Sequence, residues 1–262
     1  MLPYIFAAFA LCFLLERARP GWRLPVVRGW WWRVLAINGA QLAIVVVAGF
    51  TWERWASRAS LLHLSDHVGP ALGGLIAYFI ATFIFYWWHR ARHESDVLWR
   101  CFHQIHHSAQ RLEVITSFYK HPIEMTVNSL IGSALVYALL GLTPEAGAVY
   151  TLSTALGEFF FHANVTTPRW VGFFFQRPEM HRIHHEHGHH RNNYGDITWW
   201  DMLFGTTRIR RASAGPAAST IAASSASATC CAGATSIAAE PRARGAPAAQ
   251  RAIENSTALL TA

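Results

Sequence analysis

Long stretches without charged residues are the feature that most limits the folds open to this chain. The clearest runs from Gly69 to Trp88, and two others run from Val34 to Trp52 and from Met125 to Pro144. Each has about the 20 residues that a helix needs to cross a bilayer. A fourth, from Ala146 to His162, is interrupted only by Glu158. Backbone polar groups facing lipid must bond within their own segment, so these stretches predict an all-α helical membrane bundle.

The first fifteen residues, MLPYIFAAFALCFLL, are apolar but short for a full crossing. Arginines follow this run instead of preceding it, and no small-residue cleavage site ends it, so it does not have the pattern of a signal peptide. We interpret it as a retained membrane anchor.

Composition supports the membrane interpretation. Hydrophobic residues make up 52% of the chain and charged residues 14%, against about 25% charged in ordinary soluble domains. The net charge of +7 comes mainly from arginines scattered singly between apolar runs, which argues against nucleic-acid binding. The four cysteines form no pair of CxxC elements, which argues against a thiolate zinc site.

The arginines also predict an orientation. They are dense between the first two apolar runs and again after the run that ends at Trp88, whereas residues 53–66 carry two arginines balanced by two acids. Positive loops face the cytoplasm. The N-terminus is therefore expected outside, and the histidine-rich segments are expected on the cytoplasmic side of a multi-pass protein.

Histidines supply the candidate chemistry. One HxxxH pair continues the helix that leaves the membrane at Trp88, and two HxxHH triples follow, each with helical spacing that places its members on one face. Imidazole is a ligand for zinc, copper, iron and nickel, and this number of ligands exceeds the four of a structural zinc, so two metal ions are expected. With one more histidine at the end of the fifth apolar run, the predicted ligands are His89, His93, His103, His106, His107, His162, His181, His184 and His185.

Other polar residues are candidates for a supporting role. We expect each of them either to bind metal or to orient a histidine that does. These candidates are His121, Glu158, His189, Asn193 and Asp196. Glu158 stands out because an acid inside a membrane helix is expensive to bury. Asp201, by contrast, is expected to tie down the segment that follows the last triple.

Taken together, HRARH, HQIHH and HRIHH, with FFFHANV before the last and NNYGDITWWDMLFGT after it, resemble the fatty acid hydroxylase / sterol desaturase superfamily. The resemblance covers about Gly69 to Thr206. It implies an integral membrane enzyme with two non-haem iron ions, bound by the nine histidines above, and with O2 as co-substrate. His121 resembles part of the His-Pro element of the sterol-oxidising branches. Thr166 stands where some members have a further histidine.

The resemblance implies an O2-dependent oxidoreductase that hydroxylates, or desaturates, a C–H bond of a lipid, fatty acyl or sterol-like, taken from the bilayer. No GxGxxG fingerprint for a dinucleotide occurs, so the electrons are expected from a separate ferredoxin- or cytochrome-type donor with its reductase. The alternative is a membrane metal-binding or metal-transport protein without oxygenase activity. Transporters hold their substrates near the midplane, and histidine faces that point apart would favour this alternative.

Three parts are therefore predicted along the chain. Residues 1–68 form membrane anchor helices, and residues 69–207 form the catalytic domain. Residues 208–262 are rich in Ala, Ser, Gly and Pro, a composition that cannot bury a core and is typical of a disordered tail.

Overall fold

The computed structural model describes residues 2–56, 58, 60–189 and 191–209. Within these residues the fold is all-α, as predicted, and the only β-type pairing is an isolated bridge between Phe175 and Ile197. The longer helices are α1 (Leu2–Ala18), α2 (Trp30–Phe50), α4 (Pro70–Glu94), α7 (Pro122–Ser133) and α8 (Pro144–His162). The shorter ones are α3 (Trp52–Ala56), η1 (Leu64–Asp66), α5 (Asp96–Leu98), the π-helix η2 (Trp99–His103), α6 (Gln104–His107), η3 (Val114–Thr116), the π-helix η4 (Ala134–Leu139), η5 (Arg169–Phe173), α9 (Pro178–His184) and α10 (Thr198–Leu203).

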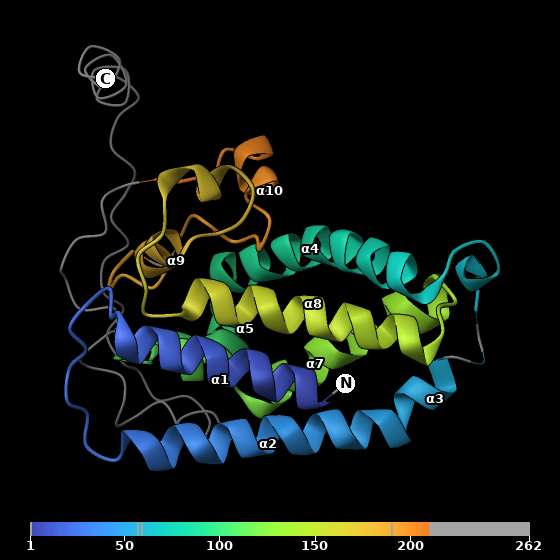
Figure 1. The fold of residues 1–262 in the computed structure, drawn as a ribbon, viewed down its shortest axis with the longest axis horizontal. Helices are drawn as coiled ribbons and strands as arrows, with labels where there is room; N and C mark the ends of the chain where they lie inside the picture. Colours follow the sequence, from blue (N-terminus) through green and yellow to red (C-terminus); the bar gives the residue numbers. More distant parts are fainter. Residues whose placement is uncertain (1, 57, 59, 190, 210–262) are drawn as a thin grey trace. The chain divides into compact units, whose positions relative to one another are not determined.

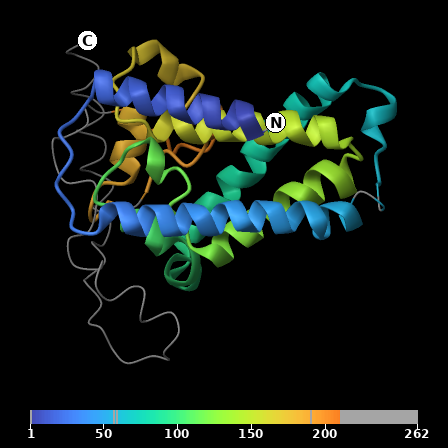
Figure 2. The same cartoon turned by 60° about the horizontal axis from the view of Figure 1, so that its bottom comes forward.

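Helices α4 and α8 form the centre of the bundle and run side by side in the same direction (Figures 1 and 2). Their close approach depends on glycine, because a Cβ added at Gly74 would lie 2.5 Å from the Cβ of Val149 and 2.6 Å from the carbonyl oxygen of Ala146. Both helices start with proline in the first turn, where its missing N–H is not needed. They end at the same end of the bundle, which is where His89 and His93 of α4 and His162 of α8 lie.

In the part of the chain that the structure describes, three helical segments are long and apolar enough to cross a membrane: Trp30–Ala56, Pro70–Glu94 and Pro122–Leu139. They coincide with three of the predicted apolar stretches, and the first includes both α2 and α3. The N-terminal helix α1 has 17 residues, short of a full crossing as the sequence indicated. Helix α8 does not meet the same hydropathy criterion, although it packs along α4.

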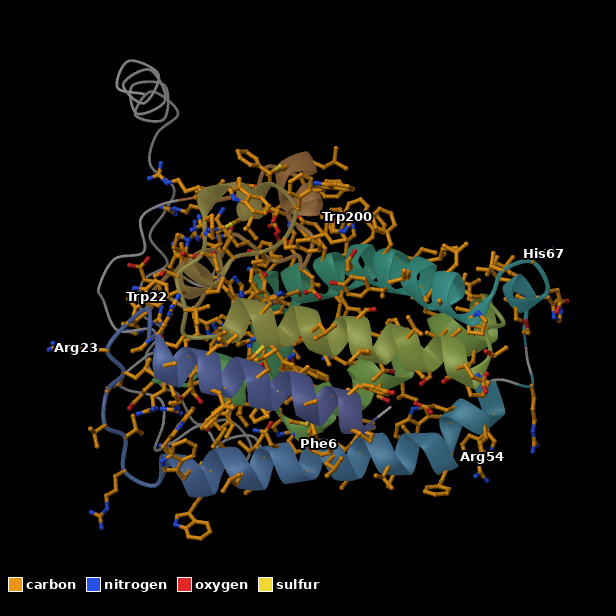
Figure 3. All side chains as sticks on the ribbon, in the orientation of Figure 1. Phe6, Trp22, Arg23, Arg54, His67 and Trp200 are labelled. Atoms are coloured by element: carbon orange, nitrogen blue, oxygen red, sulfur yellow. The ribbon has the colours of Figure 1, made fainter. Side chains whose placement is uncertain are left out.

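The loops divide between the two ends of the bundle. The arginine-rich linker after α1 lies at the histidine end, where Trp22 and Asn164 exchange two hydrogen bonds of 3.1 and 2.9 Å. At the opposite end the backbone N–H of Leu61 donates to the carbonyl of Ala138 at 2.9 Å. Trp22 and Arg23 thus lie far from Arg54 and His67 (Figure 3). The positively charged loops therefore share an end with the histidines.

The predicted tail lies outside the described residues except for Arg208 and Ile209. Arg208 still contacts the domain, because its backbone N–H donates to Asn193 Oδ1 at 2.8 Å and its guanidinium lies 3.2 Å from His189 Nε2. The contacts of the domain thus extend at least one residue beyond the predicted boundary at 207.

Candidate metal centre

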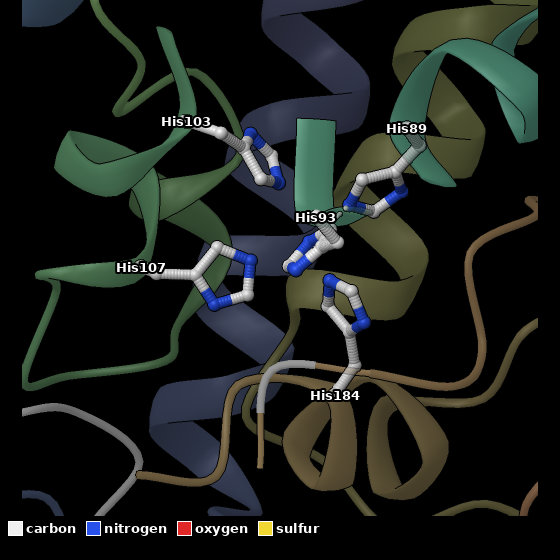
Figure 4. A group of neighbouring side chains, drawn as sticks. All are labelled: His89, His93, His103, His107 and His184. Atoms are coloured by element: carbon white, nitrogen blue, oxygen red, sulfur yellow. Dashed lines mark hydrogen bonds between the residues drawn. The ribbon is translucent and has the colours of Figure 1, made fainter. Parts of the chain in front are cut away.

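All nine histidines singled out by spacing converge, and they do so as two groups. The first has five members, His89, His93, His103, His107 and His184, whose rings point toward one another (Figure 4). The second has four, His106, His162, His181 and His185. In each group one nitrogen of every ring lies within 4.8 Å of the others. Each group could therefore hold a metal ion.

Each HxxHH triple is divided between the groups. In the first triple, the first and last histidines (103 and 107) join the five-histidine group and the middle one (106) joins the other. The second triple does the reverse, since 181 and 185 join the four-histidine group and 184 joins the five-histidine group. Each group therefore takes an i, i+4 pair from one triple and a single i+3 histidine from the other. Shared helical spacing alone did not predict this exchange.

Several ring nitrogens face one another at short distances. The Nε2 atoms of His89 and His93 are 3.3 Å apart, and those of His162 and His106 are 3.4 Å apart. The Nε2 of His181 lies 3.1 Å from that of His162 and from that of His185. Metal–nitrogen bonds of about 2.0–2.1 Å place two ligand nitrogens about 3 Å apart around one ion. The spacing therefore fits nitrogens that share a cation.

The opposite ring nitrogen is turned to a backbone carbonyl in four of the nine histidines. Each of four Nδ1 atoms lies 2.7–3.2 Å from a backbone carbonyl: His89 with Tyr194, His106 with Tyr119, His162 with Glu158 and His184 with Asn192. A carbonyl can only accept, which assigns the proton to Nδ1 and leaves the Nε2 lone pair facing the group. Metal-binding histidines use this device to fix ring orientation and tautomer.

Burial keeps the histidines outside the apolar helices neutral. It lowers the pKa of His103, His106, His107 and His181 well below the usual value, and neighbouring positive groups, led by Arg92 for His103 and by other histidines for the rest, lower it further. Neutral imidazole is the form that binds metal. Since the buried His103 Nε2 also has no hydrogen-bond partner, a metal ion fits the residues present.

A buried carboxylate that sequence reasoning missed orients His103. Glu124, fully buried in the first turn of α7, accepts from His103 Nδ1 at 3.1 Å and forms a short ion pair with Arg92. Glu124 lies three residues after His121 in the segment YKHPIE, of which only His121 was predicted to take part in the site. The available signal was an acid at the start of an apolar run, the criterion that singled out Glu158.

Two of the supporting candidates lie beside the four-histidine group. Glu158 Oε2 is 3.4 Å from His162 Nδ1, and its other oxygen forms a 2.6 Å ion pair with Lys120. Asp196 lies on the neighbouring loop, where its Oδ2 would be 3.3 Å from a Cβ added at Gly157. Burial, and after it the charge of Glu158, raises the pKa of Asp196 to about 7. Neither acid belongs to either histidine group.

The remaining candidates lie outside the two groups. His121 caps α7, because its Nδ1 accepts from the backbone N–H of Ile123 at 3.2 Å. His189 contacts Asn192 and Arg208. Asn193 is buried and its amide donates to the carbonyls of Met180 and Arg208, so it supports the backbone of this segment. The exposed Thr166 is not part of either group.

Asp201 has the structural role that the sequence predicted. It is buried and accepts from the backbone N–H groups of Tyr194 and Gly195 at 2.9 and 2.8 Å, and from the Thr206 hydroxyl at 2.6 Å. These bonds fix the loop whose Tyr194 carbonyl orients His89.

In the described residues, fold and site together define a helical protein with three helices apolar enough to cross a membrane and two adjoining, largely buried histidine groups that could hold metal. The chain belongs to the fatty acid hydroxylase family, whose model matches residues 74–206. The match includes all nine histidines.

Three relatives have names that describe reactions on lipids. The chain is 27% identical over 145 residues to sphingolipid C4-hydroxylase sur2 of Schizosaccharomyces pombe, an alignment that covers 54% of this chain and 50% of the relative. It is 32% identical over 187 residues to ornithine lipid hydroxylase OlsE of Rhizobium tropici, covering 66% and 54%. It is 28% identical over 134 residues to human alkylglycerol monooxygenase, covering 50% and 29%. The chain thus spans about half the length of the first two relatives. No solved structure matches it significantly.

Proposed function

We propose that this chain is a multi-pass membrane oxygenase that binds two iron ions through its nine clustered histidines and hydroxylates a lipid with O2. The observation that carries the proposal is the convergence of these histidines into two buried groups with ring nitrogens turned inward. The same convergence removes the feature, histidine faces pointing apart, that would have favoured a metal-binding or metal-transport protein without oxygenase activity.

The iron ions, once bound, supply the activation of O2 that C–H hydroxylation needs. The protein's part is to hold the histidines neutral and oriented, through Glu124 and the backbone carbonyls, and to exclude water by burial. In the overall reaction, one C–H bond, one O2, two electrons and two protons are converted to one C–OH group and one water molecule. The sequence has no dinucleotide fingerprint, so a ferredoxin- or cytochrome-type donor with its reductase supplies the electrons.

The substrate class follows from the relatives and from the membrane helices. A sphingolipid, an ornithine lipid and an alkylglycerol all have a polar head and a long alkyl chain, and the names of the three relatives specify these lipids. We therefore favour a long-chain polar lipid over a sterol-like substrate. The arginine-rich linker at the histidine end supports a cytoplasmic location for the site, because positively charged loops favour that side of a membrane.

The test starts with metal content. Detergent-purified protein, reconstituted with ferrous iron, is expected to hold about two iron ions per chain. His184→Ala is expected to lose much of this iron, whereas His67→Ala, an exposed histidine at the other end of the bundle, is expected to match the wild type.

The second step uses the loaded protein, a ferredoxin with its reductase, and bacterial polar lipids under ¹⁸O2. Mass spectrometry is expected to find a lipid heavier by one ¹⁸O atom, absent from the His184→Ala reaction. Two bound irons that fail to react with O2 after reduction would contradict the oxygenase assignment and favour a metal-binding protein. Failure to retain iron at all would contradict the site itself.

A further inference from the structure

Two short segments on either side of the last histidine triple expose large apolar side chains. We define the aromatic surface as Trp170, Phe173, Phe174, Phe175, Trp199, Met202 and Leu203, each at least 40% exposed. The first four lie in and after η5, and the others lie in α10. Contiguous apolar surfaces of this kind mark contacts with a protein partner or a membrane.

The position of α10 favours a membrane over a protein partner. The indole N–H of Trp200 donates to the hydroxyl of Thr82 at 2.9 Å, and its ring lies 5.4 Å from Phe79 and 5.0 Å from Phe83. Thr82 is the middle residue of α4, a helix long and apolar enough to cross a membrane. Helix α10 therefore lies beside the middle of α4, and Trp200 appears beside that helix in Figure 3.

The backbone of the two segments is bonded as a lipid environment requires. The N–H groups of Phe174 and Phe175 both donate to the Val171 carbonyl at 3.0 Å, and the N–H of Thr198 donates to the Phe174 carbonyl at 3.2 Å. The indole of Trp199 donates to the Phe173 carbonyl at 2.9 Å. Unpaired backbone groups are too costly in hydrocarbon, and these are paired within the two segments.

Charge is confined to the margin of the aromatic surface, where the exposed Arg169 precedes Trp170. Residues 170–175 contain no charged side chain, and residues 197–204 contain only Asp201, which is buried and turned toward the loop of Tyr194. By contrast, the C-terminal end of α4 carries the exposed Glu94.

We propose that the aromatic surface is inserted into the lipid bilayer beside α4, so that the two segments on either side of the last histidine triple are membrane-contacting elements. Its direct partner is a lipid surface. This proposal rests on the membrane crossing of α4 in the proposed function, but not on the oxygenase chemistry. It places acyl chains in contact with the segment whose carbonyls orient His89 and His184, so a lipid need not leave the bilayer to reach the histidine end.

Spin-label depth measurements test the insertion directly. In a background without Cys12, Cys101, Cys230 and Cys231, single cysteines replace Phe174 or Leu203, and the labelled protein is reconstituted into phosphatidylcholine vesicles. Collision with O2, which concentrates in lipid, is compared with collision with a water-soluble nickel complex. Leu75→Cys on the exposed face of α4 and Glu94→Cys at its charged end serve as the lipid and water references.

Labels at Phe174 and Leu203 are expected to give O2-to-nickel ratios close to that at Leu75 and several-fold above that at Glu94. Ratios equal to the Glu94 value would overturn the proposal. So would protection from both reagents together with label–label distances between two copies, because the surface would then be a dimer contact. Iron content, measured on each labelled variant first, shows that the site is intact, so a lack of oxygenase activity leaves this result interpretable.

Discussion

Single side chains and backbone carbonyls around the nine histidines orient the imidazoles of the two proposed metal sites. His103 is held by Glu124, whereas His89, His106, His162 and His184 are held by backbone carbonyls. Of these five orienting groups, only Glu124 acts through a side chain, so it is the one that a substitution can remove directly.

Glu124→Gln is expected to weaken metal binding. Glutamine keeps the shape but removes the charge that pairs with Arg92 and accepts from His103, and losses of about 10–100-fold in metal affinity are typical when such an orienting group is changed. Competition with a chelator measures the affinity. Glu145→Gln, an exposed acid in the first turn of α8, is the matched control, and equal affinities for the two variants would show that Glu124 does not position His103.

The stability of metal-free protein is expected to fall as the pH drops below about 6.5. Burial lowers the folded-state pKa of His103, His106, His107 and His181. Above that pH these histidines are neutral in both states, so their contribution to stability does not change. Below it the unfolded chain takes up protons that the folded chain cannot, which favours unfolding. Asp196, whose folded-state pKa is raised to about 7, contributes in the opposite direction, so the measurement is made on Asp196→Asn protein. Thermal unfolding of chelator-treated protein between about pH 7.5 and 5.5 measures the effect, and a constant Tm across this range would show that these histidines titrate normally.

Sequence spacing identified which histidines converge but not how they divide. The first triple starts in a π-helix and continues into α6, and His185 lies just past the end of α9, so ideal helical geometry does not apply to either triple. The orienting carbonyls belong to backbone, which carries no sequence signature. Asn192 adopts a positive φ of 68°. Asparagine tolerates this conformation, but its presence in a sequence does not predict it.

At the scale of elements, the packing of α4 on α8 determines whether the histidines meet. These helices carry three of the nine between them, and Gly73 and Gly74 allow their backbones to approach. The sequence predicted α4 well, because an uncharged run of about 20 residues has few possible structures other than a membrane-crossing helix. It could not predict α10 lying against α4, because a six-residue helix has no periodicity long enough to indicate its partner.

Gly74→Ala is expected to destabilise the protein by about 1–3 kcal/mol and to lower its metal content. The added methyl group would meet Val149 and the Ala146 carbonyl at less than 3 Å, so the two helices must separate. Gly39→Ala in α2, where a Cβ has nothing within 4 Å, is the control and is expected to be neutral or slightly stabilising. Thermal unfolding and iron per chain are the measurements, and similar behaviour of the two variants would contradict the role of close packing.

For the molecule as a whole, the distribution of charge along the chain predicts its orientation. Alternate loops are rich in arginine, and the structure places the linker after α1 at the histidine end and residues 60–64 at the other. Composition did not predict how deeply α8 lies in the membrane. This helix packs on α4 but does not have the hydropathy of a membrane-crossing helix.

A membrane-impermeant maleimide tests this orientation in intact cells. In the cysteine-free background, Leu61→Cys is expected to react from outside, whereas Arg23→Cys is expected to react only after the membrane is opened. Both positions are exposed, so a difference in labelling reports sidedness and not burial. The opposite pattern would place the histidine end outside the cell.

Each triple contributes histidines to both groups, and this limits how chains of this type can vary in length. A residue inserted within either triple would rotate the following side chains around the helix axis, by about 100° where the helix is ideal. Because each triple contributes to both groups, one such insertion is expected to disturb both histidine groups at once. Gains and losses of residues are therefore expected to be confined to the connecting loops, while the five-residue length of each triple stays fixed wherever both sites are retained.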